Sequence, residues 1–130
     1  MSFKTDLQQI NHAITLEKAC EFTSRFREQL PAIVHPNFAS ALPYAETFNK
    51  EVFNTLINIT GSIGIRIYLG LDEENQVRMI VVAVDENNQA ILSAPGMSAR
   101  GLTAHGASES VIFEFAQRCP PMCAKGPLDA

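Results

Sequence analysis

The chain has 130 residues and a mass of 14.3 kDa, a length at which one compact domain buries roughly two-thirds of its unfolded surface. Hydrophobic residues make up 46% and charged residues 18% of the sequence, a composition that argues against wholesale disorder. The formal net charge of -4 excludes the basic surface that nucleic acids and anionic membranes require, so we expect neither as a partner.

The start of the chain and its cysteine count bear on the cellular compartment. No apolar run of signal-peptide length opens the sequence, and no segment approaches the ~20 apolar residues of a membrane-spanning helix. The three cysteines, an odd number, suit a reducing compartment better than a framework of disulfides. We therefore expect a cytoplasmic protein.

Two amphipathic helices are predicted in the first half of the chain. The first begins after Thr15, whose hydroxyl can cap it, and ends at Pro31; the residues before Thr15 can form a short separate helix. After a proline-containing linker, the second helix opens near Pro43 and stops at Gly61. Apolar residues recur along each helix at steps of three and four, so one side of each should face a core. These two stripes comprise Leu16, Ala19, Cys20, Thr23, Phe26 and Leu30, and Ala45, Phe48, Val52, Leu56 and Ile59.

Residues 63–92 predict consecutive antiparallel strands. From 63 to 71 the odd positions are isoleucine or leucine and the even positions are glycine, arginine or tyrosine, which predicts a strand with one buried face. Two nearly identical acidic turns, DEENQ at 72–76 and DENNQ at 85–89, separate this strand from a second over 77–84 and a short third at 90–92. We expect the stability of the protein to centre on this hairpin, with Ile65 and Ile67 in the middle of its buried face.

The last third of the chain is less regular. Residues 93–110 are small and polar with three glycines, which predicts a long loop. Residues 111–118 are β-branched and aromatic, which favours a last strand over a last helix without deciding between them. Residues 119–130 contain consecutive prolines and are expected to form an irregular tail.

This order of elements predicts a single α+β domain over residues 1–130. Two helices from the first half would pack on one face of a small, mainly antiparallel sheet of three to four strands. A doubly wound fold is excluded, because its helices and strands alternate along the chain.

The acidic turns and the cysteines are the candidate ligand groups. Each turn matches only the first half of a calcium-binding loop, so we interpret both as solvated turns and expect no cofactor. Cys119 and Cys123 are spaced differently from a redox Cys-x-x-Cys pair, although zinc sites tolerate their spacing. Together with a histidine such as His105 they form a second hypothesis, a thiol- or metal-dependent site. The alternative is a proline-stiffened tail that docks on the fold.

Arg66 and Tyr68 are a third candidate site. Both should point away from the aliphatic face of their strand, and the flanking Gly64 and Gly70 leave room for a partner to approach. The neighbouring strand, which includes Val82, makes this second face too apolar to stay wet. Either the chain's own C-terminal segment or a second subunit covers it, or it forms a ligand groove in which Arg66 binds an anion.

The hairpin GIRIYLGLDEENQVRMIVVAVDENNQ, the helical region before it and the ending QRCPPMC resemble a group of small uncharacterised bacterial proteins. That group shares a G-[VI]-R-I-Y hairpin and a C-P-P-x-C ending, and the resemblance covers about residues 15–123. It implies a small bacterial α+β protein and carries over no activity, cofactor or catalytic residue. Our first hypothesis is therefore a non-enzymatic binding or interaction module for a protein or a small molecule, forming a homodimer through the second sheet face.

Overall fold

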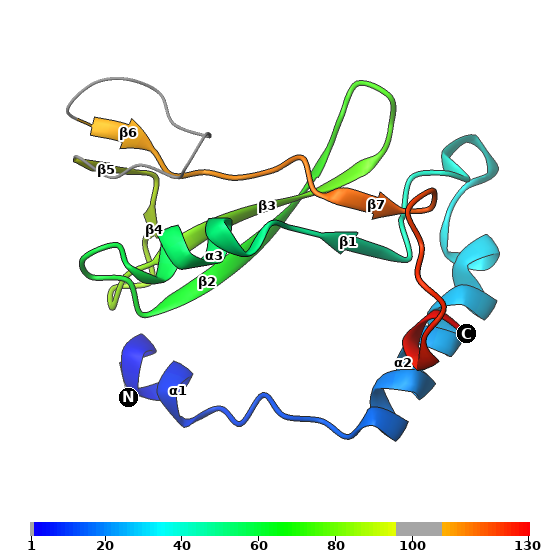
Figure 1. Cartoon of the computed structure of the whole chain (residues 1–130), viewed down its shortest axis with the longest axis horizontal. Coiled ribbons are helices and arrows are strands. Elements are labelled where there is room, and N and C mark those ends of the chain that lie inside the picture. Colours follow the sequence, from blue (N-terminus) through cyan, green and yellow to red (C-terminus); the bar gives the residue numbers. More distant parts are fainter. Residues whose placement is uncertain (1, 96–107) are drawn as a thin grey trace. The chain divides into compact units, whose positions relative to one another are not determined.

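The computed structural model describes residues 2–95 and 108–130 of the chain (Figure 1). Its contacts divide the chain into two compact units, each assembled from three separate stretches. Unit 1 comprises residues 1–10, 48–69 and 79–115, and unit 2 comprises residues 11–47, 70–78 and 116–130. Helices and antiparallel sheets occur together, so the predicted α+β class is confirmed.

The first two helices begin where their capping residues predict. Helix α1 (Phe3–Gln9) is capped by Ser2, and α2 (Leu16–Ile33) is capped by the Thr15 hydroxyl, which accepts a hydrogen bond from the Lys18 N–H at 3.0 Å. The prediction that Pro31 ends the helix was wrong, because α2 continues through it to Ile33. Only the last turn follows the proline, and Val34 N–H still donates to the Leu30 carbonyl at 3.1 Å.

The second predicted helix starts later than expected. Residues Ala45–Thr47 form a short strand, β1, which pairs antiparallel with β7 (Gln117–Cys119). Helix α3 (Lys50–Ile57) then begins after Asn49, whose side chain accepts a hydrogen bond from Glu51 N–H at 2.9 Å. Pro43 is therefore not at a helix start, because the residues that follow it pair with β7 as a strand.

Both predicted hairpins are present. Strands β2 (Gly64–Leu71), β3 (Val77–Val84) and β4 (Ala90–Ile91) form a sheet in the order β2-β3-β4. Asn75 and Asn88 occupy the left-handed region at φ 61° and 66°, which asparagine tolerates better than most residues. The repeated acidic motif thus encodes two similar turns. The turn between β2 and β3 belongs to unit 2.

The core of unit 1 lies between α3 and β3 (Figure 1). Leu56 and Val81 are completely buried there, and Phe113 exchanges two backbone hydrogen bonds with Val81, at 2.8 and 3.1 Å. Residues 111–116 form no helix, and the strand favoured for 111–118 reduces to this bridge and β7. The buried cluster comprises Val52, Leu56, Ile59, Val81, Ala83, Ala94, Val111 and Phe113.

Helix α1 lies against the other face of the sheet. A Cβ placed on Gly64 would lie 3.0 Å from Leu7 Cδ2 and 3.5 Å from Val84 Cγ2, so these three residues meet on one side. Ile65 packs against the core on the opposite side, as the alternation of a strand requires. Part of the face that was expected to need a partner is thus covered by the chain's own N-terminal helix.

The aliphatic face of β2 is buried at one end only, and the prediction for the rest of it was wrong. Ile65 packs on the core, whereas Ile67, Leu69 and Leu71 are 52%, 70% and 57% exposed. The reason is the short length of α3, which has eight residues and covers the sheet where its buried residues meet β3. Alternation shows which side chains share a face, but not how far a covering element extends.

Unit 2 is held together by short elements around α2. They are the 3₁₀ turns η1 (Pro36–Phe38) and η2 (Pro127–Asp129), the β1–β7 pair and the hairpin tip. Helix α2 has no buried residue, so its predicted stripe is half-buried at best, and Leu16 is exposed. The tail predicted as irregular lies along α2 (Figure 1) and contains η2.

The predicted loop over 93–110 begins and ends in paired strands. Strand β5 (Ser93–Pro95) pairs antiparallel with β6 (Ser108–Ser110). The residues between them, including the candidate His105, lie outside the part of the chain that the structure describes.

Candidate functional site

Arg66 and Tyr68 lie together on β2, as the period of a strand predicts. The Arg66 guanidinium donates to the Tyr68 hydroxyl at 3.3 Å and lies 5.9 Å from the centre of its ring. It also donates to the side-chain oxygen of Asn88, in the turn after β3. The candidate anion-binding group is therefore already engaged by two neighbours in its own chain. The contact of Asn88 with Arg66 was not predicted from the sequence, although the repeated turn motif marks the position of Asn88.

The remaining residues proposed for this face lie in different surroundings. Gly64 lies under Leu7 of α1, and Val82 is 1% exposed, so neither offers a surface to a partner. Gly70 is half-buried and belongs to unit 2. Of the five residues, Arg66 and Tyr68 are the two whose side chains meet, and Tyr68 remains 45% exposed.

The exposed apolar surface of β2 is on the other face of that strand. We call Ile67, Leu69 and Leu71 the β2 strip; alternate residues of a strand share one face, so their side chains form a row. A row of three aliphatic side chains, each more than half exposed, is unusual on a strand of an isolated domain. The alternation of the strand predicts these three residues to be buried in the core, whereas they are exposed.

Two adjoining hollows lie in unit 2. One has a volume of about 420 Å³ and the other about 270 Å³, and Leu30, Ala39 and Tyr44 line both. Neither is lined by Arg66 or Tyr68, so the ligand groove expected around those residues does not coincide with either hollow. The first hollow lies in the size range of small-molecule sites, and its walls are chiefly leucine, valine, proline and alanine, as the walls of such sites usually are.

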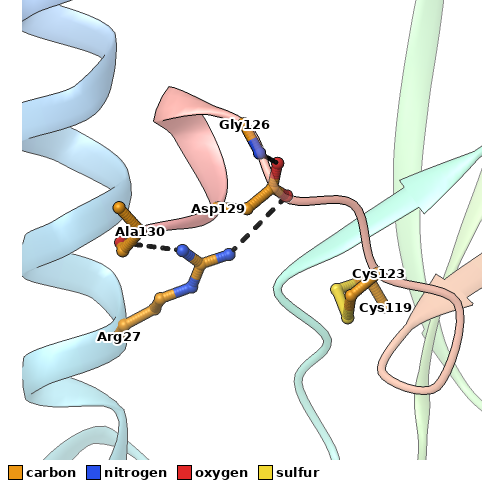
Figure 2. The surroundings of a disulfide bond; sticks show 6 residues. All are labelled: Arg27, Cys119, Cys123, Gly126, Asp129 and Ala130. Atoms are coloured by element: carbon orange, nitrogen blue, oxygen red, sulfur yellow. Dashed lines mark hydrogen bonds and ion pairs between the residues drawn. A yellow bond between two sulfur atoms is a disulfide. The ribbon is translucent and has the colours of Figure 1, made fainter.

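Among the described residues that line the larger hollow, one is a cation, Arg27, and the C-terminal tail holds it (Figure 2). Arg27 of α2 donates to the Ala130 backbone oxygen at 2.8 Å, and its guanidinium lies 4.0 Å from the Asp129 carboxylate. It also lies 4.6 Å from the centre of the Tyr44 ring. Its charge is therefore already partnered, and the residue fastens the tail to α2. The tail's Asp129 in turn accepts from Gly126 N–H at 2.9 Å.

Arg118 of β7 is the most connected cation of unit 2 among the described contacts. Its guanidinium lies 3.3 Å from the Glu46 carboxylate and donates to the backbone carbonyls of Ala41, at 3.1 Å, and of Val77. Its side chain is 9% exposed. From this buried position it links Ala41, Glu46 of β1 and Val77 at the hairpin tip. We assign it a structural role, because its described contacts are with a carboxylate and backbone carbonyls of its own unit.

Asp72 begins the turn after β2. Its carboxylate accepts hydrogen bonds from the Gln76 and Glu74 N–H groups, at 3.0 and 2.8 Å, and from the Arg78 guanidinium at 2.9 Å. The Gln76 N–H bond, followed by the Arg78 bond, lowers the pKa of Asp72 below its ordinary value. Asp85 accepts equivalent backbone bonds from Asn87 and Gln89, which agrees with the interpretation of both motifs as structural turns.

Cys119 and Cys123 are joined by a disulfide (Figure 2). The expectation that a reduced state suits this chain better than a disulfide is therefore not met at this pair. Cys119 is buried on β7, Cys123 is exposed, and Cys20 of α2 is a free thiol. Within residues 2–95 and 108–130 no three cysteine, histidine or acidic side chains gather as metal ligands would. His105 lies outside those residues, so its predicted part in a site with the cysteines stays a prediction.

Comparison of the chain with protein-family models, with curated proteins and with solved structures found no match. In the part of the chain that the structure describes, no helix is long and apolar enough to cross a membrane. The resemblance of the hairpin and the ending to a bacterial group therefore stays a prediction.

Proposed function

We propose that the protein is a non-enzymatic interaction module that acts as a homodimer, in the bacterial cytoplasm that its composition and resemblance imply. The observation that carries this proposal is the β2 strip, whose three aliphatic side chains are more than half exposed. Burying such side chains stabilises an association by about 25 cal/mol for each Å² of apolar surface removed from water. A second subunit removes that surface on both copies at once.

The position of the strip changes the expected interface. The homodimer was predicted to form through the face of Arg66, Tyr68 and Val82, but Val82 is buried and α1 covers Gly64. The opposite face of β2 is the one with uncovered aliphatic side chains. We therefore propose the interface on the strip, whereas Tyr68 lies on the opposite face of β2.

Light scattering across a range of micromolar concentrations tests the proposal. The unmutated protein should have the mass of two chains, and Leu69→Asp should reduce it to one. Ile57→Asp is a matched control, because Ile57 is 58% exposed on α3 and lies outside the strip. A well-folded, monomeric parent at every concentration would refute the homodimer.

The disulfide favours a second candidate function, thiol–disulfide exchange with a dithiol partner. In a reducing compartment bonded cysteine pairs are usually redox pairs, and here Cys123 is accessible while Cys119 is buried. A thiolate of the partner would attack Cys123 Sγ, forming a mixed disulfide and releasing the Cys119 thiolate. The partner's second thiolate would then release Cys123, so the partner is oxidised by two electrons and the pair is reduced to two thiols.

Equilibration with dithiothreitol at several ratios of reduced to oxidised reagent tests this second candidate. A midpoint near the cytosolic glutathione potential would support exchange in that compartment. A pair that resists reduction until the chain is unfolded would instead be a structural staple. Cys20→Ser is the matched control, since it removes the free thiol and leaves the pair.

A further inference from the structure

We propose that two copies of this chain pair edge to edge, with β2 of one copy antiparallel to β2 of the other, so that their sheets become continuous. This inference rests on the proposed homodimer and specifies how it forms. It differs from a face-to-face dimer, because the contact would be made by backbone hydrogen bonds as well as by side chains.

Among residues 2–95 and 108–130, no strand pairs with the second edge of β2. The order of the sheet is β2-β3-β4, so within these residues β2 pairs with β3 on one side only. Asp72 N–H donates to the Gln76 carbonyl across the turn. Backbone groups along a strand point alternately to either side, so the N–H groups of Ile67 and Leu69 point away from β3. They present to a neighbour the donors and acceptors that a further strand would pair.

This edge lacks the features by which proteins usually block strand addition. Its eight residues, GIRIYLGL, include no lysine, no acidic residue and no proline. The single charge, on Arg66, is already bonded to Tyr68 and Asn88. By contrast, the exposed turns at both ends of β3 are strongly acidic. A long and largely apolar edge strand, whose one charge is bonded within its own chain, is a surface at which intermolecular pairing is expected.

The β2 strip identifies the partner as a second copy. Antiparallel pairing about a two-fold axis near Ile67 places the odd residues of both strands on one face, so the two strips merge into one apolar row. In a register centred on Ile67, Arg66 faces Tyr68 of the other strand, and in one centred on Tyr68 it faces Gly70. Neither register opposes two arginines, so self-pairing costs no like-charge repulsion.

Amide hydrogen exchange of the unmutated protein tests the inference directly. The Ile67 and Leu69 N–H groups should exchange slowly in the dimer and about tenfold or more faster as dilution separates the copies. The Arg66 and Tyr68 N–H groups, which point toward β3, serve as internal controls and should not respond to dilution in this way. Fast exchange at Ile67 and Leu69 in a protein that light scattering shows to be dimeric would overturn edge pairing, while the proposed homodimer would stand.

A pair of substitutions at one position separates backbone from side-chain contributions. Leu69→Pro removes the outward N–H and should abolish the dimer, whereas a free edge of a folded sheet tolerates proline. Leu69→Ala keeps the N–H and should weaken the dimer less. Equal weakening by the two substitutions, with both variants folded by circular dichroism, would contradict a backbone contact. A monomeric parent would refute both the homodimer and its edge.

Discussion

The Arg118 guanidinium and the Glu46 carboxylate form an enclosed ion pair in unit 2, 3.3 Å apart, with side chains 9% and 1% exposed. Glu46 lies on β1 and Arg118 on β7, directly opposite each other in the strand register. The pair thus links two short strands that come from distant parts of the sequence. The arginine also donates to the carbonyls of Ala41 and Val77, so removing it would take away these hydrogen bonds together with the ion pair.

We expect Arg118→Ala to lower the free energy of unfolding by about 3 to 5 kcal/mol, because removing one member of a buried ion pair is strongly destabilising. Denaturant titration measures this change. Arg25→Ala is the control, since Arg25 is exposed on α2 and should contribute less than about 0.5 kcal/mol. Similar midpoints for the two variants would show that the ion pair is not a structural link.

Two successive residues of α3 give a matched test of the core. Leu56 is completely buried, whereas Ile57 is 58% exposed. Leu56→Ala should cost about 2 to 5 kcal/mol through lost burial and a cavity, and Ile57→Ala less than about 1 kcal/mol. Thermal or denaturant unfolding at one protein concentration compares them. Equal losses would contradict the orientation of α3 on the sheet.

Ile67→Ala was expected from the strand pattern to cost as much as a core substitution. Because the side chain is 52% exposed, we now expect a small effect on the unfolding of the monomer. Its effect should grow with protein concentration, because in the proposed strand pair Ile67 contacts the β2 strip of the other copy. A large loss at high dilution would restore Ile67 to the core.

Acid should weaken the turn at Asp72. Because the folded-state pKa is depressed, the ionised carboxylate stabilises the fold above the ordinary value near pH 4. This contribution disappears as the pH falls through the folded pKa. Asp72→Asn should therefore destabilise the protein at neutral pH, and the difference from the parent should shrink in acid. Asp85→Asn is the matched control, because Asp85 accepts the same two backbone bonds in its turn, whereas the bond to Arg78 is made by Asp72.

Thiol counting distinguishes a disulfide from a reduced or metal-bound pair. In denaturant without reductant, the parent should titrate one thiol per chain, that of Cys20, because Cys119 and Cys123 are bonded. Metal analysis should find no stoichiometric zinc in the parent or in Cys119→Ser/Cys123→Ser. Zinc that is present in the reduced parent and lost in the double variant would instead establish the metal-dependent hypothesis.

Local patterns predicted the hairpins well. Alternation located β2 and β3, and the Asp and Asn residues located both turns, because these signals act within a few residues. The pairing of β1 with β7 could not be predicted in this way, since Glu46 and Arg118 are partners only in three dimensions. It is this distant pairing that displaced the start of α3 from Pro43.

The candidate site was predictable only in part. The two-residue spacing of Arg66 and Tyr68 correctly implied that they share a face and can meet. The same alternation could not show that α1 covers Gly64, or that α3 stops short of Ile67. The odd cysteine count argued against a disulfide framework, but it cannot exclude one bonded pair beside one free thiol.

The interleaving of the two units sets the order in which the protein can be completed during synthesis. Unit 1 needs residues up to 115 and unit 2 needs residues up to 130, although both include residues from the first fifteen. In an emerging chain α1 is therefore synthesised before residues 48–69 and 79–115 of its unit, and α2 before residues 70–78 and 116–130 of its own. For the same reason every contiguous fragment that contains one unit whole also contains part of the other, and a chain released before residue 115 lacks residues of both units.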